Sequence, residues 1–376
     1  MIIQSKNVWL NEQFAPAQLE LENGKIKQVL AYGEKKADVD YGEDKILPGL
    51  VDIHNHGYMG RTSNNATPEW LREWVAYLPS EGVTSILATT STSPLEAMLP
   101  SFEIIRDMIK EQPKGATILG INSEGPLISK EFKGAQNENY LVKPEVETFK
   151  HWQELAGGNI IYVTIAPEKD DNFELIKYCA ETGVATAAGH TGAKFKDIEG
   201  ARTAGLNSFT HTYNGMRGLH HREPGVLGAA MYFDDLYAEL IADNGHVDNI
   251  PAYLLAKLKG KDKLILITDA VAIKGMPVGE YGDGFRKCTI GEDGIGRLAD
   301  GTLAGSSNKL NKVLMNAIEN AGIEQVVAIN AATINPLTLL KVENKGLIKE
   351  GYDADITVLD KNYDAVQTYV NGEAML

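Results

Sequence analysis

The chain of 376 residues is 43% hydrophobic and 23% charged, which is typical of a soluble globular protein. Its formal net charge of -15 argues against nucleic acid and anionic membranes as partners, because both require a basic surface. A small phosphorylated ligand remains compatible with this charge, since it needs only a few local cations or backbone N–H groups.

The cysteine content and the apolar runs indicate the compartment. Cys179 and Cys288 are the only cysteines and lie far apart, so we expect a reducing environment without disulfides. The first residues become polar too early for a signal peptide, and no run reaches the ~18 apolar residues of a transmembrane helix. These patterns predict a cytoplasmic protein without a membrane partner.

Both ends of the chain have the pattern of short strands. Residues 1–46 suggest strands at 1–4, 8–10, 18–22 and 25–30, with Asn23-Gly24 as a hairpin turn. Residues 343–376 return to strands and turns, at 351–359 and 365–370. We therefore predict one small β-sandwich domain built from both termini.

The central residues, 47–342, have a different pattern. Short apolar or β-branched runs alternate there with amphipathic helical stretches such as 68–81, 173–182 and 309–321. In addition to the run before His54, the predicted strands are 84–88, 118–122, 160–165, 185–188, 208–211, 238–242 and 264–268. This alternation predicts an α/β fold, a TIM-like (β/α)8 barrel.

His54 and His56 follow a buried apolar run and are separated by one residue. Side chains alternate faces along a strand, so both imidazoles are expected to point the same way. Such a pair can hold one metal ion. Because it can also be two solvated loop histidines, the polar residues downstream decide between the two interpretations.

Glu124, His190 and His211 each lie at the end of a predicted strand, the edge where barrel enzymes place their catalytic groups. Strict alternation would put His211 on the same face as Phe209 and turn Thr210 toward the helices. Each polar residue alone could be structural. Together, two nitrogens and one carboxylate suit a catalytic Zn or Fe site with an open position for water.

Asp269 directly follows the run 264–268. It could simply cap a helix. Next to a metal-bound water it could instead accept the proton of that water and pass it to a leaving amine.

Two loops contain candidate anion-binding groups. Arg222 lies in a loop bounded by Gly218 and Gly225, and His246 follows the run 238–242. Arg222 can bind a phosphate through two parallel hydrogen bonds, and His246 can donate another. Residues 303–307 could offer backbone N–H groups to a polar ligand.

These motifs, in this order, resemble the amidohydrolase superfamily and, within it, the family of N-acetylglucosamine-6-phosphate deacetylases. The resemblance covers nearly the whole chain, and the run Leu-His-His-Arg-Glu-Pro-Gly at 219–225 is its most specific part. The other matching segments are Pro-Gly-x-x-Asp-x-His-x-His-Gly at 48–57, Glu-Gly-Pro at 124–126, Gly-His-Thr at 189–191, His-Thr-Tyr-Asn at 211–214, Ala-Asp-Asn-Gly-His at 242–246, Thr-Asp-Ala at 268–270 and Gly-Thr-Leu-Ala-Gly-Ser at 301–306.

The resemblance implies a TIM-like barrel with a small β domain, usually as a homodimer. It also implies Zn or Fe, with one or two ions per subunit. Glu124, His190 and His211 match the principal metal ligands, and His54 and His56 match ligands of a second ion that only some members keep.

The implied reaction belongs to amino-sugar metabolism: N-acetylglucosamine-6-phosphate would be hydrolysed to glucosamine-6-phosphate and acetate. Asp269 matches the general base and acid that acts on a metal-bound water. The positions matched to substrate binding are Ala135, Gln136, Asn214, Gly215, Arg222, Asp243, His246, Leu303, Ala304 and Gly305. Some phosphate contacts are expected to come from the neighbouring subunit.

Two departures from the family pattern leave the identity of the sugar open. Gln136 stands where the family commonly has a histidine that touches the sugar, and Gly215 stands where it commonly has alanine. A deacetylase of N-acetylgalactosamine-6-phosphate, or of another N-acyl amino-sugar phosphate, is the nearest alternative. A non-catalytic barrel kept for binding is more remote, because every ligand position is filled. A cyclic-amide hydrolase is disfavoured because Glu124 occupies the position of its modified lysine.

Overall fold

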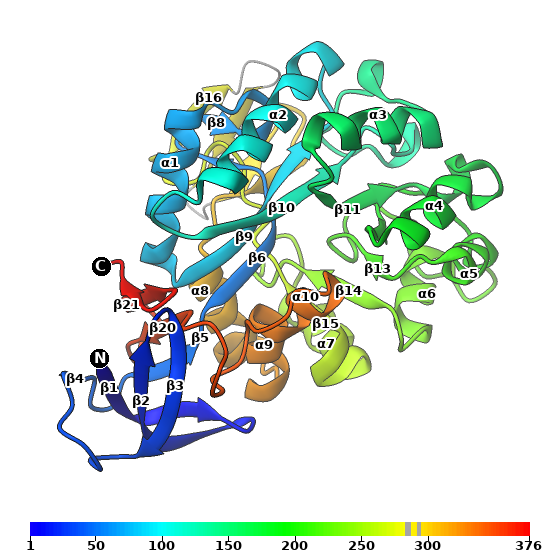
Figure 1. The fold of residues 1–376 in the computed structure, drawn as a ribbon. Helices are drawn as coiled ribbons and strands as arrows, with labels where there is room; N and C mark the ends of the chain where they lie inside the picture. The colour runs from blue at the N-terminus through cyan, green and yellow to red at the C-terminus, as the bar shows by residue number, and fades with distance from the viewer. Residues whose placement is uncertain (283–286, 292–294) are drawn as a thin grey trace.

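The computed structural model describes residues 1–282, 287–291 and 295–376. Its largest unit is a barrel of eight parallel strands surrounded by helices (Figure 1). The barrel strands, in the order of their pairing, are β6 (Leu50–Asn55), β9 (Val83–Ser91), β10 (Thr117–Glu124), β11 (Ile160–Ile165), β12 (Ala185–Ala188), β13 (Ser208–Phe209), β14 (Tyr237–Leu240) and β15 (Leu264–Leu266). The predicted barrel is confirmed.

The barrel is closed by the residues that follow β6 and β15. The pairing of the described strands ends at β15 on one side and β6 on the other. Beyond their ends, the N–H of Asp269 donates to the carbonyl of His54 at 3.0 Å, and the N–H of His56 donates to the carbonyl of Ala270 at 2.7 Å. The seam therefore closes at the carboxyl edge, where candidate site residues lie.

Helices pack around the barrel and bury its outer face. They are α1 (Pro68–Tyr77), α2 (Leu95–Glu111), α3 (Val146–Ala156), α4 (Glu174–Thr182), α5 (Phe195–Ala204), α6 (Gly225–Tyr232), α7 (Asn249–Lys263), α8 (Leu310–Met315), α9 (Gln325–Ala332) and α10 (Ile334–Leu339). Short helical turns are η1 (Ser63–Asn65), η2 (Leu78–Glu81), η3 (Lys130–Phe132), η4 (Glu138–Tyr140), η5 (Pro167–Lys169), η6 (Asp171–Phe173) and the π-helical η7 (Asn316–Asn320). A separate buried cluster that includes Val51, Leu87, Tyr162 and Ile265 belongs to the barrel strands.

Both termini contribute to a second, mixed sheet, as predicted. Figure 1 shows the blue N-terminal strands beside the red C-terminal ones. Its strands are β1 (Ile2–Leu10), β2 (Gln13–Glu22), β3 (Lys25–Ala31), β4 (Val39–Asp40), β5 (Lys45–Pro48), β20 (Ile356–Leu359), β21 (Ala365–Val370) and β22 (Glu373–Ala374). The sheet curls around its own core, since Lys25 of β3 pairs with Asp353 just before β20. The domain boundaries at residues 46 and 342 stay a prediction.

Two predicted N-terminal strands, at 1–4 and 8–10, are a single strand. β1 runs from Ile2 to Leu10, and its pairing with β2 shifts register between Ser5 and Val8. The polar residues 5–7 were predicted to separate two strands. They are accommodated by this irregularity instead, because a bulge allows a strand to continue past an extra residue.

The predicted orientation of the strand at 208–211 is wrong. β13 ends at Phe209, which packs in the outer core, with Lys259 of α7 5.6 Å from the centre of its ring. The hydroxyls of Thr210 and Thr164 lie 2.8 Å apart, so Thr210 contacts β11 rather than the helices. His211 has a φ of 27°, so strand alternation no longer applies to it.

A third sheet was not predicted. β16 (Gly279–Gly282), β17 (Lys287–Ile290), β18 (Ile295–Arg297) and β19 (Leu303–Ser306) form antiparallel pairs after β15. A further short pair joins β7 (Gly57–Tyr58) to β8 (Arg61–Thr62). None of the described helices is long and apolar enough to cross a bilayer.

A buried ion pair offers a test of the packing around the barrel. Lys274 Nζ lies 2.6 Å from Glu81 Oε2, and both side chains are at most 1% exposed. Lys274→Met would leave a buried carboxylate without its partner and should cost about 3–5 kcal/mol in the free energy of unfolding, measured with urea. The double variant Lys274→Met, Glu81→Leu should recover most of this loss. Equal losses in the two variants would contradict this account.

Candidate functional site

The candidate site lies where the barrel strands end, and three of its residues have an unusual backbone. His190, His211 and Asp269 follow β12, β13 and β15, with φ values of 47°, 27° and 47°. Residues other than glycine rarely adopt this left-handed region, and such strain is concentrated at functional sites. The turn at each strand end directs the side chain over the mouth of the barrel instead of continuing the strand.

Glu124, His190 and His211 form one compact group. Oε1 of Glu124 lies 2.8 Å from Nε2 of His190 and 2.9 Å from Nε2 of His211, and the two nitrogens are 3.1 Å apart. All three residues are buried. The structure therefore brings together the three residues that the sequence suggested as a metal-binding set.

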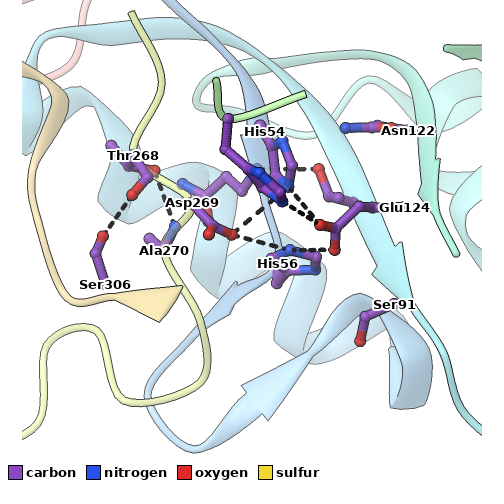
Figure 2. Close-up of polar contacts among 12 residues, drawn as sticks. His54, His56, Ser91, Asn122, Glu124, Thr268, Asp269, Ala270 and Ser306 are labelled. Atoms are coloured by element: carbon purple, nitrogen blue, oxygen red, sulfur yellow. Dashed lines mark hydrogen bonds and ion pairs between the residues drawn. The ribbon is translucent and has the colours of Figure 1, made fainter. Parts of the chain in front are cut away.

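His54, His56 and Asp269 form a second group on the other side of Glu124. Oδ1 of Asp269 lies 3.5 Å from Nε2 of His54 and 3.2 Å from Nε2 of His56. The same two nitrogens lie 3.7 Å and 3.3 Å from the carboxylate of Glu124. Figure 2 shows His56 between Asp269 and Glu124, with a contact to each. The two histidines point the same way, as predicted.

The donor atoms suit cations. Within each group the ligand atoms all lie within 4.8 Å of one another, and each group offers two imidazole nitrogens and one carboxylate. This is the ligand chemistry preferred by Zn and by non-haem Fe. Nε2 of His54 is buried without a hydrogen-bond partner, which is costly for an isolated protein group but fits a metal ligand. The residues therefore fit a metal site.

The tautomers of three histidines also favour metal binding. Nδ1 of His190 donates to the carbonyl of Phe132 at 2.8 Å, and Nδ1 of His211 donates to the carbonyl of Asn214 at 3.1 Å. Because a carbonyl can only accept, the proton is on Nδ1 and each Nε2 can present its lone pair to the centre. His54 is held in the same way, through Nδ1 to a carboxylate.

That carboxylate is Glu239, which no sequence pattern had singled out. Its Oε2 lies 2.9 Å from Nδ1 of His54 and accepts the backbone N–H of His211 at 2.9 Å. Glu239 is fully buried on β14. The available signal was its position, since a lone acid inside the apolar run 238–242 cannot be a solvated residue in a buried strand.

The electrostatics favour a positive ion at the centre. Burial disfavours the charged form of His54, yet Glu239 and Asp269 raise its pKa to about 10. Burial opposes ionisation of Glu124, but His190 and the other histidines hold its pKa well below its usual value. For Asp269 the same balance lowers the pKa to about 2. Both carboxylates are therefore ionised at neutral pH.

A network of buried hydrogen bonds fixes Asp269 in place. The carboxylate of Asp52 accepts the hydroxyl of Thr268 at 2.6 Å and the side-chain amide of Asn55 at 3.0 Å. The hydroxyl of Ser306 donates to the carbonyl of Thr268 (Figure 2). Asp52 thus ties β6 to the residue before Asp269, across the seam of the barrel.

A cavity of about 240 Å³ opens onto both groups. Most of the residues predicted to bind metal or substrate line this cavity. Its lining residues are His56, Ser91, Glu124, Gly134, Ala135, Gln136, His190, His211, Asn214, Gly215, His246, Asp269, Val271, Thr302, Leu303, Ala304 and Gly305. His54 lies behind this lining, fully buried.

Gly215 illustrates how closely the loops pack at this cavity. Its φ is 57°, and a Cβ at this position would lie 2.8 Å from Nδ1 of His190. An alanine would therefore displace the imidazole or strain the loop. The absence of a side chain at Gly215 therefore leaves room for the imidazole of His190 in its observed position.

Two predicted substrate residues are not part of the cavity lining. Arg222 is exposed, and its Nη1 lies 2.9 Å from Nε2 of His221. Asp243 lies behind His246: its Oδ2 accepts Nδ1 of His246 at 2.7 Å and the amide of Asn308 at 2.8 Å. Asp243 therefore orients His246, and the sequence did not reveal Asn308 as its second partner.

A parallel barrel with buried imidazoles and carboxylates at the carboxyl ends of its strands is typical of enzymes that use one or two metal ions. The chain belongs to the amidohydrolase family, whose model matches residues 46–375.

Individual relatives agree with this assignment. The chain is 36% identical over 94% of its length to the N-acetylglucosamine-6-phosphate deacetylase of Lysinibacillus sphaericus, and covers 91% of it. It is 30% identical over 97% of its length to the N-acetylgalactosamine-6-phosphate deacetylase of Escherichia coli O157:H7, and covers 95% of it. A mutant N-acetyl-D-glucosamine-6-phosphate deacetylase from Mycobacterium smegmatis, solved with N-acetyl-D-glucosamine-6-phosphate, has a TM-score of 0.94 at 28% identity, covering 100% of this chain and 99% of that one.

Glu239 provides a test of how the second group is organised. Glu239→Gln keeps the volume but removes the charge that holds His54, so zinc affinity at the His54 group should fall about 10-fold. Titration of the metal-free protein against a chromophoric chelator measures this. Glu199→Gln, at an exposed position of α5, is the matched control. Equal affinities in the two variants would contradict the role given to Glu239.

Proposed function

We propose that this protein hydrolyses the acetamide of N-acetylglucosamine-6-phosphate, giving glucosamine-6-phosphate and acetate. The observation that carries the proposal is the position of Asp269, whose carboxylate borders the cavity 3.2 Å from His56 and beside the shared Glu124. The names of the relatives supply the substrate class.

Asp269 would move the proton in this reaction. It is ionised at neutral pH, so it can accept a proton from the water that attacks the acetyl carbon. The protonated carboxyl is then a strong acid and can deliver this proton to the amine nitrogen as the C–N bond breaks. The products are acetate and the free amino sugar.

Glu124, His190 and His211 would hold the principal ion, and His54 and His56 a second one. A bound Zn or Fe ion would act as a Lewis acid that polarises the acetyl carbonyl and makes water more acidic. The protein's own part is to hold these groups rigidly and to keep both carboxylates ionised. We therefore infer one or two divalent transition-metal ions per subunit.

The remaining cavity residues would bind the sugar phosphate. Burial lowers the pKa of His246, but Asp243 outweighs this effect and raises it, which favours the charged form that donates to a phosphate. Its Nε2 is buried without a hydrogen-bond partner. The amides of Gln136 and Asn214 and the strip Leu303, Ala304 and Gly305 would contact the sugar. Anchoring the phosphate orients the acetamide for attack.

Arg222 would act across a homodimer. Its exposure outside the cavity of its own chain, in a loop that also exposes Leu219, supports a role toward the neighbouring subunit. We expect the protein to work in the cytoplasm, a proposal supported by the buried thiols of Cys179 and Cys288.

The second candidate substrate is N-acetylgalactosamine-6-phosphate. It is favoured by the relative from Escherichia coli O157:H7, and the replacement of the family histidine by Gln136 leaves the identity of the sugar open. Acetate release from the two epimers, measured side by side, distinguishes them. We expect the higher kcat/KM for N-acetylglucosamine-6-phosphate. The proposed function would be overturned if neither substrate released acetate.

Asp269→Asn tests the proton-transfer role. This variant keeps the shape of the side chain but cannot accept a proton, so kcat should fall about 10²–10⁴-fold. Zinc should still bind at Glu124, His190 and His211. Native mass spectrometry of the variant can verify that the metal is retained. Full activity in this variant would end the assignment of Asp269.

The double variant His54→Ala, His56→Ala tests the number of ions. If each group holds one ion, the metal content per chain should fall by about half, because only one ligand set is removed. Elemental analysis of protein purified with excess zinc measures this content. An unchanged content would argue against a second ion, and a complete loss would argue against two separable sites.

A further inference from the structure

Gln136 departs from the family pattern and occupies a distinctive place in the site. It follows η3 in the loop after β10, and its backbone N–H donates to the carbonyl of Lys133 at 3.0 Å. Only 6% of the residue is exposed, although it lines the cavity. A buried amide needs partners at both ends of its side chain, and these partners identify its role.

Both ends of the Gln136 amide are engaged. Its Oε1 accepts the backbone N–H of Thr92 at 2.9 Å, and its Nε2 donates to Oε2 of Glu124 at 3.1 Å. A backbone N–H can only donate, so the oxygen of the amide must face Thr92. The NH2 group is thereby directed at the carboxylate of Glu124, and the opposite orientation of the amide is excluded.

The two oxygens of Glu124 have different surroundings. Oε1 faces the nitrogens of His190 and His211 at 2.8 Å and 2.9 Å, and lies farther, at 3.7 Å, from Nε2 of His54. Oε2 faces Nε2 of His56 at 3.3 Å and also accepts from Gln136. A carboxylate oxygen has two lone-pair sites, so Gln136 uses one and leaves the other for the group containing His56.

We propose that Gln136 is a positioning residue that holds Glu124 in the orientation shared by both cation groups. The last torsion of a glutamate side chain is broad, so without this donor the carboxylate could rotate away from His56. Gln136 and His56 share Oε2, whereas both His190 and His211 lie on Oε1. Loss of this donor should therefore lower the affinity for the ion that His56 helps to hold more than the affinity for the other ion. This inference rests on the two-ion form of the proposed function.

The test is a metal titration of Gln136→Glu. The new carboxylate keeps an acceptor for the N–H of Thr92 but replaces the donor to Glu124 with a repelling charge. Calorimetric titration of the metal-free protein with zinc should show affinity for the second ion reduced about 10–100-fold. The affinity for the first ion should change much less, and kcat should fall more than KM rises.

Two variants control for charge and folding. Asn137→Asp adds the same charge one residue away, on an exposed side chain, and should leave both affinities unchanged. Gln136→Met removes the donor without adding charge, and it should also lower the affinity for the second ion more than the affinity for the first. The Tm of each metal-free variant reports any loss of folding separately from the loss of metal.

The outcomes separate this inference from the proposed function. Wild-type affinities in Gln136→Glu together with a raised KM would overturn the positioning role and leave only a contact to the sugar. An equal loss of affinity for both ions would also overturn the positioning role. If the wild-type protein binds no transition metal at all, the proposed function itself fails.

Discussion

The carboxylate of Glu124, buried among four imidazoles, is the interaction on which the rest of the site depends. His190 and His211 lie within 2.9 Å of one of its oxygens, and His54 and His56 approach it from the other side at 3.7 Å and 3.3 Å. A buried charge is costly unless it is paired, so the buried carboxylate of Glu124 requires the histidines that surround it. Backbone carbonyls and Glu239 fix the tautomers of His190, His211 and His54, and the buried amide of Gln136 orients the carboxylate.

The fold supplies the constraints that hold this arrangement. Parallel strands end at one edge of the barrel, which brings residues far apart in sequence to the same place. The left-handed backbones of His190, His211 and Asp269 would be unfavourable in isolation and persist because the surrounding packing determines them. The seam between β6 and β15 is closed by the segments that contain His54, His56 and Asp269 themselves. The contacts that close the barrel therefore also position the group formed by His54, His56 and Asp269.

Sequence patterns predicted the barrel, the shared terminal sheet and the residues at the strand ends, because these depend on local periodicity. The orientations of Phe209 and Thr210 were predicted wrongly because the chain leaves β13 two residues earlier than the pattern suggested. Glu239 was missed because its partner, His54, is 185 residues away in the chain. The sheet β16–β19 was not predicted because its strands have only three or four residues each, which is too short for a clear periodicity. The contact of Gln136 with Glu124 likewise depends on how a loop folds back.

We infer that Glu124 is shared between two cation sites. A crystal grown with zinc, with anomalous diffraction recorded on both sides of the zinc edge, tests this most directly. We expect two anomalous peaks per chain, one bonded to His190 and His211 and one to His54 and His56, with an oxygen of Glu124 bonded to each. A Glu124 carboxylate bonded to a single ion, or turned away from both, would contradict it.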